Sequence, residues 1–99
     1  MKLISWNLNG IRAVEKKGLV DIIDHMNPDI IGFQETKAQD DQVLTALEQL
    51  SGYHIYSSSA IKKGYSGTAI LSKKKPINIS YGLGIDEHDK EGRLICAEY

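Results

Sequence analysis

The sequence predicts an α/β fold, a mixed sheet with flanking helices, and three observations support this. A short apolar strand at Lys2–Trp6 is followed by apolar residues spaced three and four apart between Leu19 and Met26, as on one face of a helix. A second apolar run covers Asp29–Gln34. A strand, a helix and a strand within about thirty residues form a βαβ unit. We expect its two strands to be parallel.

The remaining elements follow from local signals. The first helix begins after Gly18 and ends by Asn27-Pro28, since proline lacks the amide hydrogen that a continuing helix needs. Asp40–Leu50 has acidic residues in its first turn and apolar residues on one face, which predicts a second helix. Short strands are then expected at Tyr53–Ser57, Thr68–Ser72, Ile77–Tyr81 and Arg93–Tyr99. Residues 62–67 and 86–92 are rich in turn formers and predict loops.

Length, charge and cysteine content limit the class of protein. Ninety-nine residues make one small domain, and a formal net charge of −1 argues against binding of nucleic acid by a uniformly basic surface. Any site for a polyanion must therefore be local. The single Cys96 cannot form an internal disulfide, and its alternating apolar strand predicts a buried thiol. Without a signal peptide or membrane span, we expect a soluble intracellular protein, cytoplasmic in a bacterium or nuclear in a eukaryote.

Polar side chains end both strands of the βαβ unit. Asn7 follows the first strand and Glu35 the second, and the carboxyl ends of parallel strands meet at one edge of a sheet. A carboxylate beside an amide oxygen suits a hard cation such as Mg²⁺, which uses few protein ligands. The alternative is structural: Asn7 and Asn9 form an Asx turn with Gly10, and Glu35 begins a solvated loop.

Four ordered segments resemble a known family. They are Ile4-Ser5-Trp6-Asn7-Leu8-Asn9-Gly10-Ile11-Arg12-Ala13, Ile31-Gly32-Phe33-Gln34-Glu35-Thr36-Lys37, Gly64-Tyr65-Ser66-Gly67-Thr68-Ala69-Ile70-Leu71-Ser72 and His88-Asp89-Lys90-Glu91-Gly92-Arg93-Leu94. Together they resemble the first part of the exonuclease III family of abasic-site endonucleases, in the endonuclease/exonuclease/phosphatase superfamily. The resemblance covers essentially the whole chain. It implies the first half of a four-layer, DNase I-like α/β sandwich, and residues 1–99 as an incomplete N-terminal part of that domain.

The resemblance also implies an activity and roles for residues. The activity is Mg²⁺-dependent hydrolysis of the phosphodiester 5′ to an abasic site in duplex DNA, with 3′-to-5′ exonuclease activity as a second one and Mn²⁺ as a substitute metal. Glu35 would be the main metal ligand and a catalytic residue, together with Asn7. Asn9 would lie beside the metal site. The residues implied in DNA binding are Arg12, Ala13, Lys17, Lys37, Gly64, Tyr65 and Arg93.

Several assignments stay open at this stage. Either Lys16 or Lys17 could occupy the DNA-binding position that the resemblance implies for Lys17. Arg93 could equally form a structural ion pair. Lys73-Lys74-Lys75 is expected to be only a solvated hairpin turn. The family's water-activating Asp, its His and its site Tyr would lie beyond Tyr99, so the chain alone could be an inactive fragment. We also expect copies to associate through an uncovered sheet face. Another superfamily branch, such as a nonspecific nuclease or a lipid phosphodiesterase, is a further alternative.

Overall fold

The computed structural model describes all residues 1–99 and contains two sheets. The larger sheet has the strand order β1-β2-β4-β3. Its strands are β1 (Leu3–Asn7), β2 (Ile30–Gln34), β3 (His54–Ser58) and β4 (Thr68–Ser72). β1 and β2 are parallel, as predicted, and β4 is antiparallel to both of its neighbours. The smaller sheet pairs β5 (Asn78–Tyr81) with β6 (Ile95–Glu98) in antiparallel fashion.

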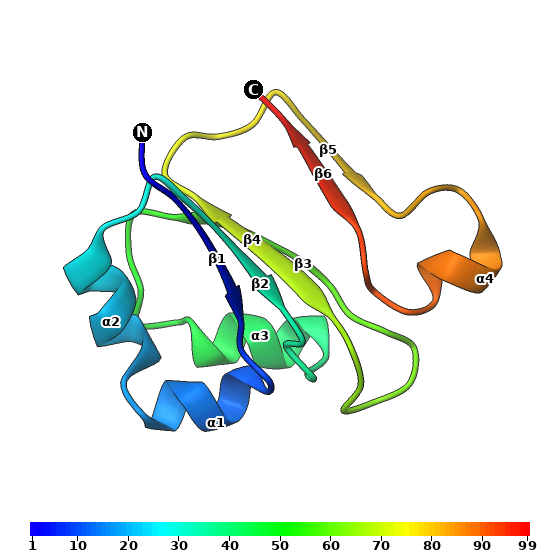
Figure 1. Cartoon of the computed structure of the whole chain (residues 1–99), viewed down its shortest axis with the longest axis horizontal. Helices are drawn as coiled ribbons and strands as arrows, with labels where there is room; N and C mark the ends of the chain where they lie inside the picture. The colour runs from blue at the N-terminus through cyan, green and yellow to red at the C-terminus, as the bar shows by residue number, and fades with distance from the viewer.

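The helices cover one face of the larger sheet. They are α1 (Ile11–Lys16), α2 (Leu19–Met26) and α3 (Asp40–Ala46), and a short helix, α4 (Asp86–Asp89), follows β5. Figure 1 shows α1, α2 and α3 gathered on one side of the sheet, with β5, β6 and α4 on the other. Because side chains alternate along a strand, Ile31 and Phe33 of β2 and Ala69 and Leu71 of β4 point into the same buried core. Leu19 and Ile23 of α2 and Val43 of α3 pack into the same core, each fully buried.

Three helical segments differ from the sequence prediction. Helix α1 lies between the first predicted strand and the first predicted helix, where no helix was predicted. It is only six residues long and buries a single side chain, Ile11, so it has too little periodicity to be recognised. Helix α3 ends at Ala46 rather than Leu50, because turns replace the last helical residues. Helix α4 occupies part of a predicted loop, and none of its residues is buried.

Two predictions about single segments were wrong. Cys96 is exposed rather than buried, because β6 pairs only with β5, and Cys96 points to the open side of that small sheet while Ile95 and Ala97 are half-buried. Lys73–Lys75 is exposed as expected but does not turn a hairpin, since the strands on either side of it belong to different sheets. No helix has the length and apolar character needed to cross a membrane.

Candidate functional site

Three loops meet at the carboxyl end of β2. The first follows β1 (8–10), the second follows β2 (35–37), and the third precedes β4 (64–67). Glu35 accepts the Gly10 N–H through its carbonyl oxygen at 2.8 Å, and Thr36 accepts the Ile11 N–H at 2.9 Å. On the other side, Thr36 N–H donates to the Gly67 carbonyl at 3.1 Å and Lys37 N–H to that of Ser66 at 2.7 Å. The second loop is therefore hydrogen-bonded on both sides, as a strand would be.

Left-handed backbone conformations gather in these loops. Asn9, Glu35, Lys37 and Ser66 have φ of +48°, +54°, +52° and +51°, and the remaining non-glycine residue of this kind, Asn27, lies elsewhere. Such a conformation costs about 1–3 kcal/mol and persists only where surrounding contacts enforce it. Here the bonds between the loops enforce it, so the backbone position from which the Glu35 side chain extends is fixed.

Asn7 and Glu35 end neighbouring parallel strands. Asn7 is paired with Gln34, the residue before Glu35. The Glu35 side chain is 32% exposed, and its ion-pair partner is Arg93, whose Nη1 lies 4.0 Å from Oε1. Asn7 Oδ1 accepts the Asn9 N–H at 3.0 Å, so the Asx turn of the structural alternative is present. That turn uses one lone pair of the amide oxygen and leaves the other free.

Asn9 faces a cation. Lys37 Nζ donates to Asn9 Oδ1 at 2.5 Å, and Arg12 Nη2 donates to the Lys37 carbonyl at 3.0 Å. The Asn9 oxygen therefore positions Lys37, which is consistent with a supporting place beside a metal site rather than a direct ligand. Its metal role stays a prediction.

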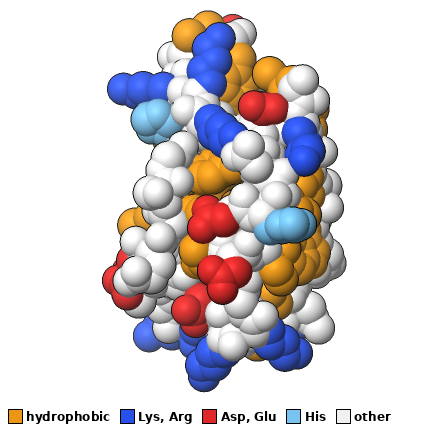
Figure 2. Space-filling model, turned by 90° about the vertical axis from the view of Figure 1, so that its left-hand side faces the viewer, with side chains coloured by type: hydrophobic (Ala, Val, Ile, Leu, Met, Phe, Trp, Pro, Cys, Tyr) orange, Lys and Arg blue, Asp and Glu red, His pale blue; other side chains and the backbone are white.

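A basic groove adjoins the three loops. It is lined by Gly10, Arg12, Ala13, Lys16, Lys17, Lys37 and Gly64, and thus by four cations and no acid. Five of the seven predicted DNA-binding residues are among them. Both Lys16 and Lys17 line it, because helix α1 ends there. Figure 2 shows Lys and Arg side chains at the lower end of one face, level with α1 in Figure 1, and again at its upper end. Most of the acidic side chains on this face lie between the two ends.

Tyr65 and Arg93, the other two predicted DNA-binding residues, form a cluster with Glu91. Tyr65 O–H donates to Glu91 Oε2 at 2.7 Å, and Arg93 Nη2 donates to the Tyr65 oxygen at 2.9 Å. Arg93 Cζ and Lys62 Nζ also lie over the Tyr65 ring, 5.6 Å and 5.2 Å from its centroid. The hydrogen bond from Tyr65 and then the Arg93 charge lower the pKa of Glu91. The ion pair considered for Arg93 exists, and its partner Glu91 was not among the predicted site residues.

The donor set fits a hard cation that uses few protein ligands. No group of three or more His, Cys, Asp or Glu residues could hold a metal ion. Glu35 supplies one partly exposed carboxylate, whose contact with Arg93 at 4.0 Å is longer than a hydrogen bond. Mg²⁺ commonly binds one or two carboxylates, keeps several waters and adds phosphate oxygens. A closed site of the zinc type would need more side chains.

Comparison with known proteins gives one consistent family. Residues 4–98 match the Endonuclease/Exonuclease/phosphatase family. An exodeoxyribonuclease of Bacillus subtilis is 51% identical over 102 residues, which cover 100% of this chain and 38% of that protein. The DNA repair nuclease APEX1 of Danio rerio is 45% identical over 101 residues, covering 100% of this chain and 33% of that protein. The chain thus spans 33–38% of the length of these relatives.

Solved structures agree with the predicted fold. An AP endonuclease from Archaeoglobus fulgidus matches with a TM-score of 0.82 and 32% identity, over 98% of this chain and 36% of that one. The 3′ phosphatase NExo from Neisseria, bound to product DNA hairpin, matches with a TM-score of 0.81 and 32% identity, over 98% and 37% of the two chains. The DNase I-like arrangement, a mixed sheet with flanking helices, is confirmed.

Proposed function

Because the chain belongs to the endonuclease/exonuclease/phosphatase family, we propose that it is the N-terminal part of a Mg²⁺-dependent DNA-repair endonuclease. The reaction is hydrolysis of the phosphodiester 5′ to an abasic site, with 3′-to-5′ exonuclease activity alongside. Relatives named as an exodeoxyribonuclease and a DNA repair nuclease match along its whole length. The observation that carries the proposal is that the loop holding the Glu35 carboxylate also supplies Lys37 to the basic groove.

Phosphodiester hydrolysis needs positive charge on the reacting phosphate and groups that hold the strand in line. Glu35 would hold Mg²⁺ or Mn²⁺, with the Asn7 oxygen beside it, and the metal when bound supplies that positive charge. Arg12 and Lys17 neutralise neighbouring phosphates, and Gly64 lets the DNA backbone approach closely. Asn9 binds the Lys37 ammonium group and so holds it beside the loop that follows the first strand.

A cleavage assay tests this proposal. The chain is mixed with Mg²⁺ and a labelled duplex that contains one abasic site, and the products are resolved on a gel. Glu35→Gln should abolish cleavage, whereas Glu48→Gln should leave it unchanged, because Glu48 is exposed and lies outside the three loops. Cleavage that survives Glu35→Gln would contradict the assignment. Equal rates on intact and abasic duplexes would favour a nonspecific nuclease.

A second candidate is a fragment that binds DNA without cleaving it and associates with itself. Two observations favour it: the chain covers only 38% and 33% of the relatives, and several large apolar side chains are exposed. Leu3 is 65% exposed and Ile77 is 75% exposed. We expect a second copy to cover such surface at high concentration. A concentration-independent monomer mass in light scattering would contradict self-association, and cleavage lost in Glu35→Gln would contradict the inactive state.

A further inference from the structure

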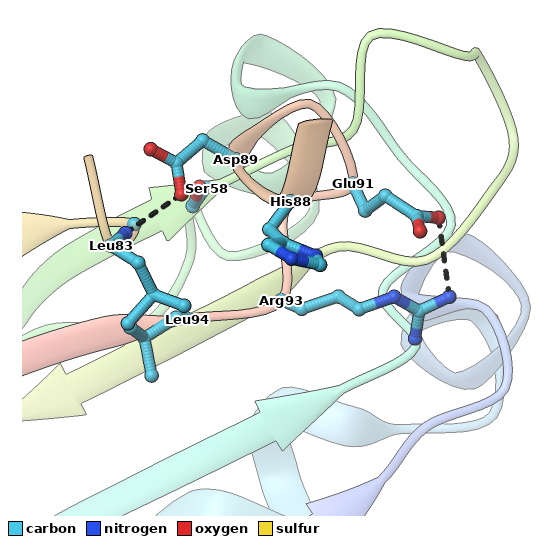
Figure 3. A pocket seen from close by; sticks show the side chains of 8 residues that line it. Ser58, Leu83, His88, Asp89, Glu91, Arg93 and Leu94 are labelled. Carbon is cyan, nitrogen blue, oxygen red and sulfur yellow. Dashed lines mark hydrogen bonds and ion pairs between the residues drawn. The ribbon is translucent and has the colours of Figure 1, made fainter. Parts of the chain in front are cut away.

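A carboxylate lies between two residues proposed to bind DNA, where its charge would repel phosphates. Glu91 Oε2 accepts the Tyr65 O–H at 2.7 Å and lies 3.5 Å from Arg93 Nη2. Arg93 Nη2 in turn donates to the Tyr65 oxygen at 2.9 Å. The three groups close a triangle although Tyr65 is 26 residues from Glu91 and 28 from Arg93 in sequence. Figure 3 shows the Glu91 and Arg93 side chains meeting at the end of their turn.

The turn that carries Glu91 and Arg93 is fixed to the rest of the fold. A Cβ on Gly92 would lie 2.5 Å from the Ser58 carbonyl oxygen, so this turn rests directly on the end of β3. The Ile61 N–H donates to the Lys90 carbonyl at 2.9 Å. Only glycine permits so close an approach between two backbones. The backbone that carries Glu91 is therefore held in a fixed position.

The geometry leaves Arg93 with donors to spare. Its Nη2 is used by Tyr65 and Glu91, while Nη1 reaches Glu35 only at 4.0 Å and the side chain is 51% exposed. A guanidinium has five N–H donors, so Nη1 and Nε can still face an anion. Without partners, an exposed arginine would lose conformational freedom on binding DNA. In this triangle that freedom is already lost before DNA binds.

We propose that Glu91 is a positioning residue for DNA binding, whose carboxylate holds Tyr65 and Arg93 as one preformed unit with the guanidinium free to meet a phosphate. The inference rests on the proposed function and adds to it a role for an acidic residue. Since the Tyr65 hydroxyl is the bridge between Glu91 and Arg93, its removal should act like removal of Glu91. Simple electrostatics predicts the opposite for Glu91, because loss of a negative charge strengthens binding to a polyanion.

A DNA-binding assay distinguishes the positioning role from simple electrostatics. It uses a duplex with a stable abasic-site analogue, in EDTA. Fluorescence anisotropy at several salt concentrations gives the slope of log K against log[salt]. Glu91→Ala and Tyr65→Phe should each weaken binding about two- to fivefold. Each should also reduce the slope by about 0.9, the value of one phosphate contact. The matched control is Glu87→Ala, whose side chain is 80% exposed and reaches only His88 at 3.8 Å. It should keep the slope and bind equally or slightly more tightly.

The outcomes are distinct. Tighter binding by Glu91→Ala with an unchanged slope, as in the control, would overturn the positioning role alone. Absence of salt-dependent binding by the unsubstituted chain would overturn the proposed function and this inference together. If Glu91→Ala unfolds, Tyr65→Phe still tests the positioning role, since it removes only one hydroxyl from an exposed residue. The double variant should lose no more slope than either single one, because both act through Arg93.

Discussion

Substitution of Gly67 by alanine tests whether the three loops form a rigid unit. Gly67 has φ of +90°, and a Cβ there would lie 2.2 Å from Thr36 Oγ1. Thr36 is fully buried and cannot move aside without loss. Its N–H donates to the Gly67 carbonyl at 3.1 Å, and its carbonyl accepts the Ile11 N–H at 2.9 Å. Relief of the clash must therefore move either the buried Thr36 side chain or the backbone contact between the loops.

The expected loss has two parts. An L side chain in the left-handed region costs about 1–2 kcal/mol, and insertion of a methyl group into a filled space costs about 1–3 kcal/mol. Gly67→Ala should thus lower the free energy of unfolding by about 2–5 kcal/mol. The control is Gly52→Ala, because Gly52 has φ of +84° and nothing lies within 4 Å of its added Cβ. Gly52→Ala should lose only about 1–2 kcal/mol, the cost of an L side chain in the left-handed region.

Urea unfolding followed by circular dichroism measures both values, and a second substitution locates the clash. Thr36 Oγ1 has no hydrogen-bond partner among the protein atoms, so Thr36→Ala should cost only about 1 kcal/mol of methyl burial. The double variant Gly67→Ala/Thr36→Ala should regain most of the stability that the inserted methyl group costs in Gly67→Ala. Equal losses for Gly67→Ala and Gly52→Ala, or no recovery in the double variant, would refute the rigid unit.

Two further predictions concern charge. The double variant Lys16→Gln/Lys17→Gln should lower the salt slope of DNA binding by about 1.8, two phosphate contacts, whereas Lys74→Gln/Lys75→Gln, outside the groove, should not change it in the same anisotropy assay. Asp29 accepts the Lys2 N–H at 2.5 Å, which lowers its pKa below the ordinary 3.8. The resulting stability is fully present above that value and is lost as the pH falls through the lower folded pKa. Asp29→Asn should therefore flatten the fall of Tm below pH 3.8, and an unchanged fall would contradict this.

Strong periodic patterns were enough to predict the framework of the fold. The run at Asp29–Gln34 and the helical spacing from Leu19 to Met26 predicted β2 and α2 within a residue. The βαβ argument also gave the parallel pairing that sets Asn7 beside Gln34. These elements bury whole faces in one core, so the spacing of their apolar residues predicts their type and their bounds.

The short helices have no such repeating pattern of apolar residues. Helix α1 buries only Ile11, and α4 buries nothing. Their formation depends on contacts with other segments. Asp89 illustrates this, because its carboxylate accepts the N–H groups of Leu83 and Gly84 at 2.7 Å and 2.9 Å. Cys96 was misplaced for a related reason: alternation along a strand shows two faces, but only its partner strands decide which face is covered.

The candidate site was predictable in part for the same reason. Strand ends gave the places of Asn7 and Glu35, whereas the left-handed backbone at Glu35 and Lys37 depends on bonds from the first and third loops. The near-zero net charge indicated that any polyanion site must be local. The groove meets that condition, since its cations come from α1 and the second loop and no acid lines it. One acid, Glu91, does approach the proposed DNA surface. Its carboxylate accepts a hydrogen bond from Tyr65 and forms an ion pair with Arg93. A chain of balanced composition can therefore present a locally cationic surface, because the distribution of its charges, rather than their sum, determines what it attracts.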